Sequence, residues 1–179
     1  MFACLNRYFS CNKKSEELVQ MQNQGQTLHP PAYPGLSELQ KAQHLLENVE
    51  YNNTTKYIPD VTYGKVIKVY DGDTITIAAY IDSDPSVIYR FSVRLNGIDS
   101  PEIKGKTENE KKLAKQSRDA LNNLIYGKIV KLENISMEKY GRLLAIVMCN
   151  SINVNNWMLE NKYAVPYDGG KKIIPEEWE

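Results

Sequence analysis

Acidic and basic side chains recur at short spacing in the middle of the sequence. Asp73 lies in an Asp-Gly-Asp-Thr stretch, and Asp99 and Glu102 lie in an Asp-Ser-Pro-Glu stretch. Arg94 precedes the second stretch, and Arg142 follows Lys-Tyr-Gly. Two carboxylates can hold a divalent cation, a third can act on water, and arginines bind phosphate oxygens. In combination these groups indicate hydrolysis of a phosphodiester bond.

Each acidic stretch also has a purely structural interpretation. Asp, Gly and Pro favour turns, so both stretches are typical of the connections between strands. In the functional interpretation, Asp73 and Asp99 are metal ligands through their carboxylates and Ser100 through its backbone carbonyl, because Ca²⁺ prefers hard oxygen donors. Glu102 would then orient and deprotonate a water whose pKa the cation lowers.

The arginines and two tyrosines leave similar alternatives open. Arg94 and Arg142 are either ordinary surface residues of a barrel or planar clamps for two phosphate oxygens. Tyr140 and Tyr167 either stack on nucleobases or simply pack, since the chain has 12 tyrosines. Each motif alone is weak evidence, but the order and spacing of the whole set favour the catalytic interpretation.

The hydrophobic pattern predicts the elements that position these residues. We expect one helix whose N-terminus is capped by Thr107 together with Glu110, and a last helix after Asn153. Five short antiparallel strands with the first helix inserted favour an α+β, mainly β fold, a closed five-stranded OB-fold barrel. The predicted strands cover 65–69, 74–77, 89–95, 129–133 and 143–149, and the inserted helix covers 109–126, with Leu113, Ala120, Leu121, Leu124 and Ile125 as its buried stripe.

Residues 1–58 differ from the rest and are predicted to form a mostly irregular N-terminal extension. Ser37 and Gln40 fit a capping box, and apolar residues then recur at helical spacing, which predicts a short amphipathic helix over about 38–50. This helix either packs on the main domain or binds a partner. The main domain is expected over 59–171, with a tail over 172–179.

Composition limits the function classes. The chain has 179 residues and a formal net charge of zero, so attraction to phosphate must come from local lysines and arginines or from a bound cation. No apolar stretch approaches the ~20 residues that span a bilayer, and no export signal is recognisable. The 3 cysteines lack metal-ligand spacing. These features predict an intracellular protein, with a monomer assumed.

Cys4 and Cys11 suggest a further hypothesis about location. They lie among apolar residues close to Arg7, Lys13 and Lys14. Two acyl chains plus a basic patch suffice for stable membrane association through the N-terminus. The alternative is an ordinary N-terminus with two unmodified thiols.

From about Tyr63 to Lys171 the chain resembles the staphylococcal nuclease (thermonuclease) family. The resemblance implies an OB-fold barrel that hydrolyses DNA and RNA with Ca²⁺ and leaves 3′-phosphates and 5′-hydroxyls. The stretches that carry it are Ile67 to Thr74, Phe91 to Arg94, Asp99 to Glu102, Glu138 to Arg142, and Val154-Asn155. By position it implies Asp73, Asp99 and the Ser100 carbonyl as calcium ligands, Glu102 as base, Arg94 and Arg142 as phosphate contacts, and Tyr140 and Tyr167 near the nucleotide.

The chain also departs from that family's pattern. Ser100 replaces a common Thr, and Glu138 replaces a common Asp. Lys162 stands where the last helix commonly ends in Gly, and a left-handed conformation there would be strained by roughly 1 kcal/mol. The neutral charge leaves an alternative open, in which this is a catalytically weak or inactive OB-type module that binds nucleic acid or protein.

Overall fold

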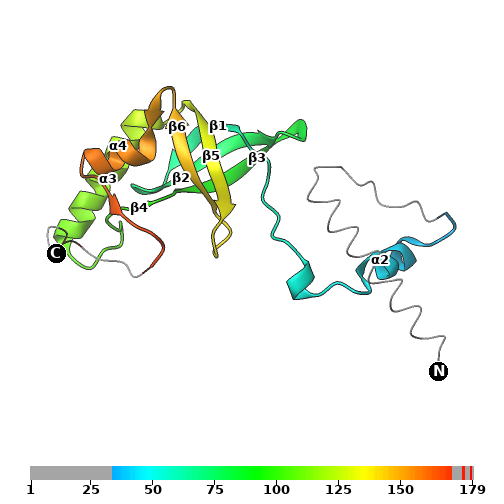
Figure 1. Ribbon diagram of the computed structural model, residues 1–179. Helices are drawn as coiled ribbons and strands as arrows, with labels where there is room; N and C mark the ends of the chain where they lie inside the picture. Colours follow the sequence, from blue (N-terminus) through cyan, green and yellow to red (C-terminus); the bar gives the residue numbers. More distant parts are fainter. Residues whose placement is uncertain (1–33, 171–174, 176–177, 179) are drawn as a thin grey trace. The chain divides into compact units, whose positions relative to one another are not determined.

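The computed structural model describes residues 34–170, 175 and 178. The chain divides into two compact units, Met1–Thr54 and Thr55–Glu179 (Figure 1). The first contains helix α2 (Glu38–Leu46) and the 3₁₀ turn η1 (Tyr51–Asn53). The predicted capping box is present, because Ser37 Oγ accepts from the Gln40 amide at 3.3 Å and Gln40 Oε1 accepts from the Ser37 amide at 2.9 Å.

Helix α2 is shorter than the predicted 38–50. After its end, side chains bind the backbone in place of helical partners: Asn53 Nδ2 donates to Asn48 O at 2.8 Å, and the Glu50 amide donates to Asn53 Oδ1 at 2.7 Å. Such local bonds compete with helix formation, and the apolar period alone does not reveal them. Packing of α2 on the main domain or on a partner stays a prediction.

The second unit is built on the predicted barrel. Its neighbouring strands pair in the order β3-β2-β1-β5-β6, and β3 pairs with β6 in parallel to close the ring. The five-stranded OB-type barrel is confirmed, but the expectation that every pair is antiparallel was wrong. Five is an odd number, so strand direction cannot alternate all the way around a closed ring. The strands are β1 (Tyr63–Val69), β2 (Thr74–Ile81), β3 (Asp84–Leu95), β5 (Ile129–Met137) and β6 (Leu143–Cys149).

Alternating side chains of these strands fill the barrel. Residues 143 to 149 alternate between buried and half-buried along β6, and on β3 both Val93 and Leu95 are fully buried. Burial of each such side chain stabilises the fold by roughly 1.5–3 kcal/mol, which fixes the register. Arg94 between them must therefore lie on the opposite face, as predicted.

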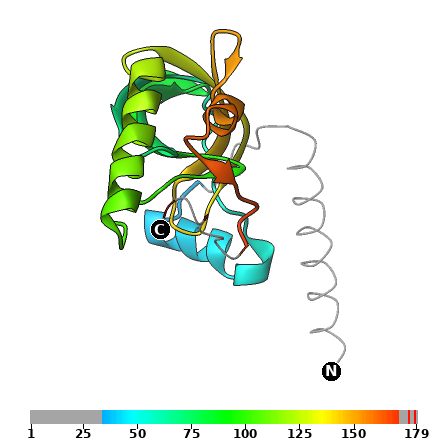
Figure 2. The same cartoon turned by 90° about the vertical axis from the view of Figure 1, so that its left-hand side faces the viewer.

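Two helices, α3 (Glu108–Ile125) and α4 (Val154–Glu160), accompany the barrel. Figures 1 and 2 place them at one end, with the β2–β3 hairpin extending away from them. The predicted stripe of α3 was partly wrong, because Ala114 and Ser117 are buried while Leu113 and Ala120 are only half-buried. A pattern based on large apolar residues misses Ser117, whose Oγ donates to Tyr163 O at 2.7 Å and joins α3 to the segment after α4.

Three short strands were not predicted: β4 (Ile98–Asp99), β7 (Ile152–Asn153) and β8 (Val165–Pro166). Two-residue strands are too short to show a period. β4 and β8 pair antiparallel, with Asp99 opposite Val165. The pairing continues as the Tyr167 amide donates to Gly97 O at 3.0 Å, so Asp99 and Tyr167 are brought to the same place.

Lys162, the second residue after α4, offers a test of backbone strain. Lys162 has φ of 60°, a conformation that costs a residue with a side chain about 1 kcal/mol more than glycine. Lys162→Gly is expected to raise the free energy of unfolding by about 0.5–1 kcal/mol, measured by urea denaturation at unchanged m-value. Lys104→Gly, at an exposed position without positive φ, is the control and should lose stability. A loss at Lys162 would contradict the strain argument.

Candidate active site

Arg94 joins the two predicted metal-ligand carboxylates. Its Nη1 donates to Asp73 Oδ1 at 2.6 Å and its Nη2 donates to Asp99 Oδ1 at 3.0 Å. The Ser100 amide donates to Asp73 Oδ2 at 3.1 Å, and Asp73, Asp99 and Ser100 are all buried. Burial alone would lower the pKa of Arg94, but the charges of Asp73 and Asp99 outweigh it and raise that pKa. Four of the predicted site residues therefore form one buried ionic cluster.

Asp71 belongs to the same cluster, and the sequence reasoning missed it. Its Oδ1 accepts from the Asp73 amide at 3.1 Å. Burial, and then the charge of Asp73, raise the pKa of Asp71 from 3.8 to about 7, and Glu102 adds to the effect. The Asp-Gly-Asp pattern was typical of an exposed turn, in which such a shift would not occur.

Gly72 explains why this turn is buried. A Cβ at Gly72 would lie 1.8 Å from Ser117 Oγ and 2.7 Å from Ser100 Cβ. The glycine is required because helix α3 and the Asp99-Ser100 segment approach the backbone closely, and not because of a positive φ. This close approach places the carboxylates of Asp71 and Asp73 in a low-dielectric environment.

The donor atoms at this cluster suit a hard divalent cation. Asp71, Asp73 and Asp99 set three carboxyl groups against the single guanidinium of Arg94, and the pKa of Asp71 is raised first by burial and then by the charge of Asp73. Carboxylate and carbonyl oxygens are what Ca²⁺ prefers. Among residues 34–170, 175 and 178, however, no three acidic, His or Cys side chains are spaced as a metal-binding group. The donor chemistry fits the cation, while Arg94 supplies the positive charge between Asp73 and Asp99 in this arrangement.

Arg142 is linked to the cluster through a threonine that the sequence reasoning had not singled out. Its Nε and Nη2 bind the carboxylate of Glu138, the second at 3.1 Å, and its Nη1 donates to Thr74 Oγ1 at 3.2 Å. The Thr74 hydroxyl donates in turn to Asp73 Oδ1 at 2.8 Å. A continuous chain of hydrogen bonds thus runs from Glu138 to Asp73, and it orients the second arginine toward the same site.

A cleft of about 490 Å³ collects the remaining predicted residues. Its lining includes both arginines, Asp99, exposed Glu102, Tyr140 and Tyr167. The Tyr167 ring centroid lies 5.8 Å from Arg94 Cζ, and its hydroxyl donates to Gly170 O at 3.0 Å. Tyr140 is 74% exposed, with Lys139 Nζ 4.9 Å from its ring centroid. Both rings thus line the cleft: the Tyr167 ring is held by its hydroxyl, and the Tyr140 ring is open to solvent.

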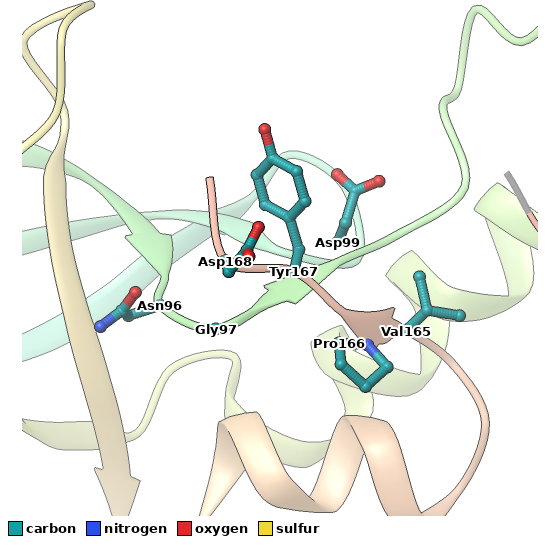
Figure 3. Close-up of a pocket in the computed structure, with 7 residues that line it drawn as sticks. All are labelled: Asn96, Gly97, Asp99, Val165, Pro166, Tyr167 and Asp168. Carbon is teal, nitrogen blue, oxygen red and sulfur yellow. The ribbon is translucent and has the colours of Figure 1, made fainter. Parts of the chain in front are cut away.

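An adjoining hollow of about 500 Å³ shares Asp99, Tyr167 and Asp168 with this cleft. Figure 3 shows Tyr167 and Asp99 projecting to the same side of the β4–β8 pair, with Asp168 next to Tyr167. Asp168 Oδ1 accepts from the Gly170 amide at 2.9 Å. With Glu138 and Asp168 in the lining, the cleft is not uniformly positive, which agrees with the neutral net charge of the chain.

Comparison with known proteins agrees with this geometry. The family described as "Staphylococcal nuclease homologue" matches residues 92–176. A protein of Escherichia coli named "Uncharacterized endonuclease" is 32% identical over 126 residues, which cover 63% of this chain and 74% of that protein. The chain belongs to the staphylococcal nuclease homologue family. The family match includes Arg94, Asp99, Glu102 and Arg142, and Asp73 lies upstream of it.

Plant members of the staphylococcal nuclease family are similar over a shorter region. A probable staphylococcal-like nuclease of Oryza sativa subsp. japonica, CAN2, is 36% identical over 83 residues, 46% of this chain and 21% of that protein. Staphylococcal-like nuclease CAN1 of Arabidopsis thaliana is 33% identical over 93 residues, 50% of this chain and 26% of that protein. The chain thus spans only about a fifth to a quarter of these plant relatives.

The hypothesis of membrane association is not addressed by these features. Cys4 and Cys11 lie outside the described residues, so their acylation stays a prediction. Within the part of the chain that the structure describes, no helix is both long and apolar enough to cross a bilayer.

Proposed function

We propose that this chain is a calcium-dependent endonuclease that hydrolyses DNA and/or RNA and leaves 3′-phosphate and 5′-hydroxyl ends. The observation that carries the proposal is a single cleft that contains Arg94, Asp99, Glu102 and Arg142. Asp73 stands behind it, hydrogen-bonded to Arg94 and through Thr74 to Arg142. Positioning and neutralisation of phosphate oxygens are what phosphoryl transfer chiefly requires.

The chain's own residues divide the reaction between them. Arg142 and Arg94 bind non-bridging phosphate oxygens and stabilise the charge that gathers on them. Glu102 takes a proton from the attacking water as the water oxygen bonds to phosphorus. The bond between phosphorus and the 5′ oxygen breaks, and the 5′ oxygen takes up a proton from solvent water. Ca²⁺ held by Asp73, Asp99 and the Ser100 carbonyl would lower the pKa of bound water and neutralise phosphate charge.

Both arginines are already bound to carboxylates, and this bears on substrate affinity. Arg142 holds Glu138, while Arg94 holds Asp73 and Asp99. A phosphate group must compete with these partners, so nucleic-acid binding should be modest and should weaken as salt is raised. Stacking on Tyr140 and Tyr167 adds about 1–3 kcal/mol per base and is insensitive to sequence.

The test is cleavage of end-labelled single-stranded DNA and RNA in Ca²⁺ and in EGTA. We expect cleavage in Ca²⁺ and none in EGTA, and products with 3′-phosphate ends. The cleavage rate should fall by about 10²–10⁴-fold in Glu102→Gln. Glu108→Gln, an exposed glutamate outside the cleft, is the matched control and should match the native rate. Equal cleavage in EGTA would contradict the proposal. Oligonucleotide binding without calcium and without cleavage would favour the OB-type binding module instead.

A further inference from the structure

Glu102 stands on a segment that belongs to no strand or helix. Residues 100–107 connect β4 to α3, and the Glu102 side chain is exposed, so packing does little to hold it. Within this connection the Gly105 amide donates to Glu102 O at 2.8 Å. A residue of α3 also contacts the backbone of Glu102.

That residue is Glu110, whose role differs from the one predicted. Thr107 Oγ1 accepts from the Glu110 amide at 3.0 Å, as an N-cap should. The Glu110 carboxylate does not return to the cap, however: its Oε1 accepts from the Glu102 amide at 3.4 Å and its Oε2 from the Lys106 amide at 2.9 Å. Glu110 is only 6% exposed. A buried carboxylate is costly unless it is hydrogen-bonded, so Glu110 is stable in this position only while it keeps its hydrogen bonds to the connection.

Gly105 provides a second, independent sign that the connection wraps around this carboxylate. A Cβ at Gly105 would lie 2.3 Å from Glu110 Oε2 and 2.4 Å from its Cδ. Gly105 has no positive φ, so a side chain at this position would displace the Glu110 carboxylate without straining the backbone conformation. The first turn of α3 also favours a negative charge, because its backbone N–H dipoles point toward it.

We propose that Glu110 is a positioning residue that fixes the backbone of Glu102, and thereby places the Glu102 carboxylate against the attacking water. This role rests on the proposed nuclease function. Glu110 lies outside the cleft lining and reaches the chemistry only through Glu102. A displacement of about 1 Å in a catalytic group can cost about 10²-fold in rate, so loss of the support lowers turnover more than binding.

Two variants remove the contact from opposite sides. Glu110→Gln keeps the shape of the side chain but presents an NH₂ group to one of the two backbone amides. Gly105→Ala leaves Glu110 unmutated, and its added Cβ displaces the Glu110 carboxylate. We expect kcat in Ca²⁺ to fall by about 10–100-fold in both. The KM for a single-stranded oligonucleotide and the calorimetric affinity for Ca²⁺ should stay within about twofold, because the phosphate and metal contacts are elsewhere.

Hydrogen exchange gives a readout that does not depend on activity. The Lys106 amide should exchange faster in both variants, measured without Ca²⁺. Glu108→Gln changes the same charge in the same helical turn, but its side chain is 90% exposed and holds Lys111, so rate and exchange should stay native.

The outcomes separate this inference from the function on which it rests. A native chain that does not cleave contradicts the proposed function. An active chain with unchanged kcat in Glu110→Gln and Gly105→Ala contradicts the positioning role. The positioning role is also overturned if calcium affinity falls in parallel with kcat. It is overturned too if kcat falls as much in Glu108→Gln, because the substitutions would then be damaging the fold in general. If Glu110→Gln fails to fold, Gly105→Ala decides by the same criteria.

Discussion

Replacing Arg142 by alanine is expected to lower the rate of phosphodiester cleavage by about 10³-fold and to leave the barrel folded. The loss follows from the planar fork that Arg142 presents to phosphate oxygens. Arg142→Lys keeps the charge but not the fork, so it should recover only part of the rate. The measurement is kcat in Ca²⁺ beside urea unfolding of each variant.

The exposure of Arg142 and its partner allows a catalytic role of the arginine to be distinguished from a structural one. Its side chain is 29% exposed and that of Glu138 is 15% exposed, so water can reach the carboxylate that the substitution leaves behind. We therefore expect a stability loss of no more than about 1–2 kcal/mol. Arg118→Ala, on half-buried Arg118 of α3, which pairs with Asp119 outside the cleft, is the control and should cleave at the native rate. Unfolding of Arg142→Ala would show that the arginine is structural.

Asp71→Asn is expected to stabilise the calcium-free protein above neutral pH. Because the pKa of Asp71 is raised from 3.8 to about 7, the folded protein holds a proton there that the unfolded chain releases. The contribution of Asp71 to the free energy of unfolding is therefore fully present below pH 4 and is lost as the pH rises through about 7. The cost above pH 7 is at most about 4 kcal/mol, at about 1.4 kcal/mol per pH unit.

The asparagine variant removes the charge and keeps the oxygen that accepts from the Asp73 amide. In EGTA, denaturant unfolding should show a gain of a few kcal/mol at pH 8 that shrinks to near zero at pH 4. Asp84→Asn is the opposite case, because hydrogen bonds from Ser86 lower the pKa of exposed Asp84; it should show no gain. Equal stability of Asp71→Asn and the native protein at pH 8 would contradict the raised pKa that burial and the charge of Asp73 give to Asp71.

The barrel was predictable because each strand of it carries its own signal. Asp71 and Gly72 separate the apolar stretches 65–69 and 74–77, and 143–149 is a continuous apolar run, so hydrophobic pattern and turn chemistry agreed. Arg94 could be assigned to the face opposite Val93 and Leu95 by the same alternation. The parallel β3–β6 closure followed only from strand count, which the local pattern does not express.

The site was predictable in its parts and not in its connections. Asp73, Arg94 and Asp99 were named from residue type and spacing, but their mutual hydrogen bonds depend on register. Asp71 and the buried contacts of Glu110 were missed because burial of a carboxylate is a property of tertiary packing, and neither residue type nor period reports it. Both misses had a possible signal in a neighbouring glycine, Gly72 and Gly105, whose absent Cβ makes room for the close approach.

The most direct test of a calcium-assisted hydrolase is a crystal structure of the chain grown with Ca²⁺ at a concentration that supports cleavage. The account predicts anomalous density for calcium bound by Asp73, Asp99 and the Ser100 carbonyl, with Arg94 no longer bridging both carboxylates and Glu102 hydrogen-bonded to a calcium-bound water. Arg94 still bridging Asp73 and Asp99, with no calcium between them in an active protein, would contradict it.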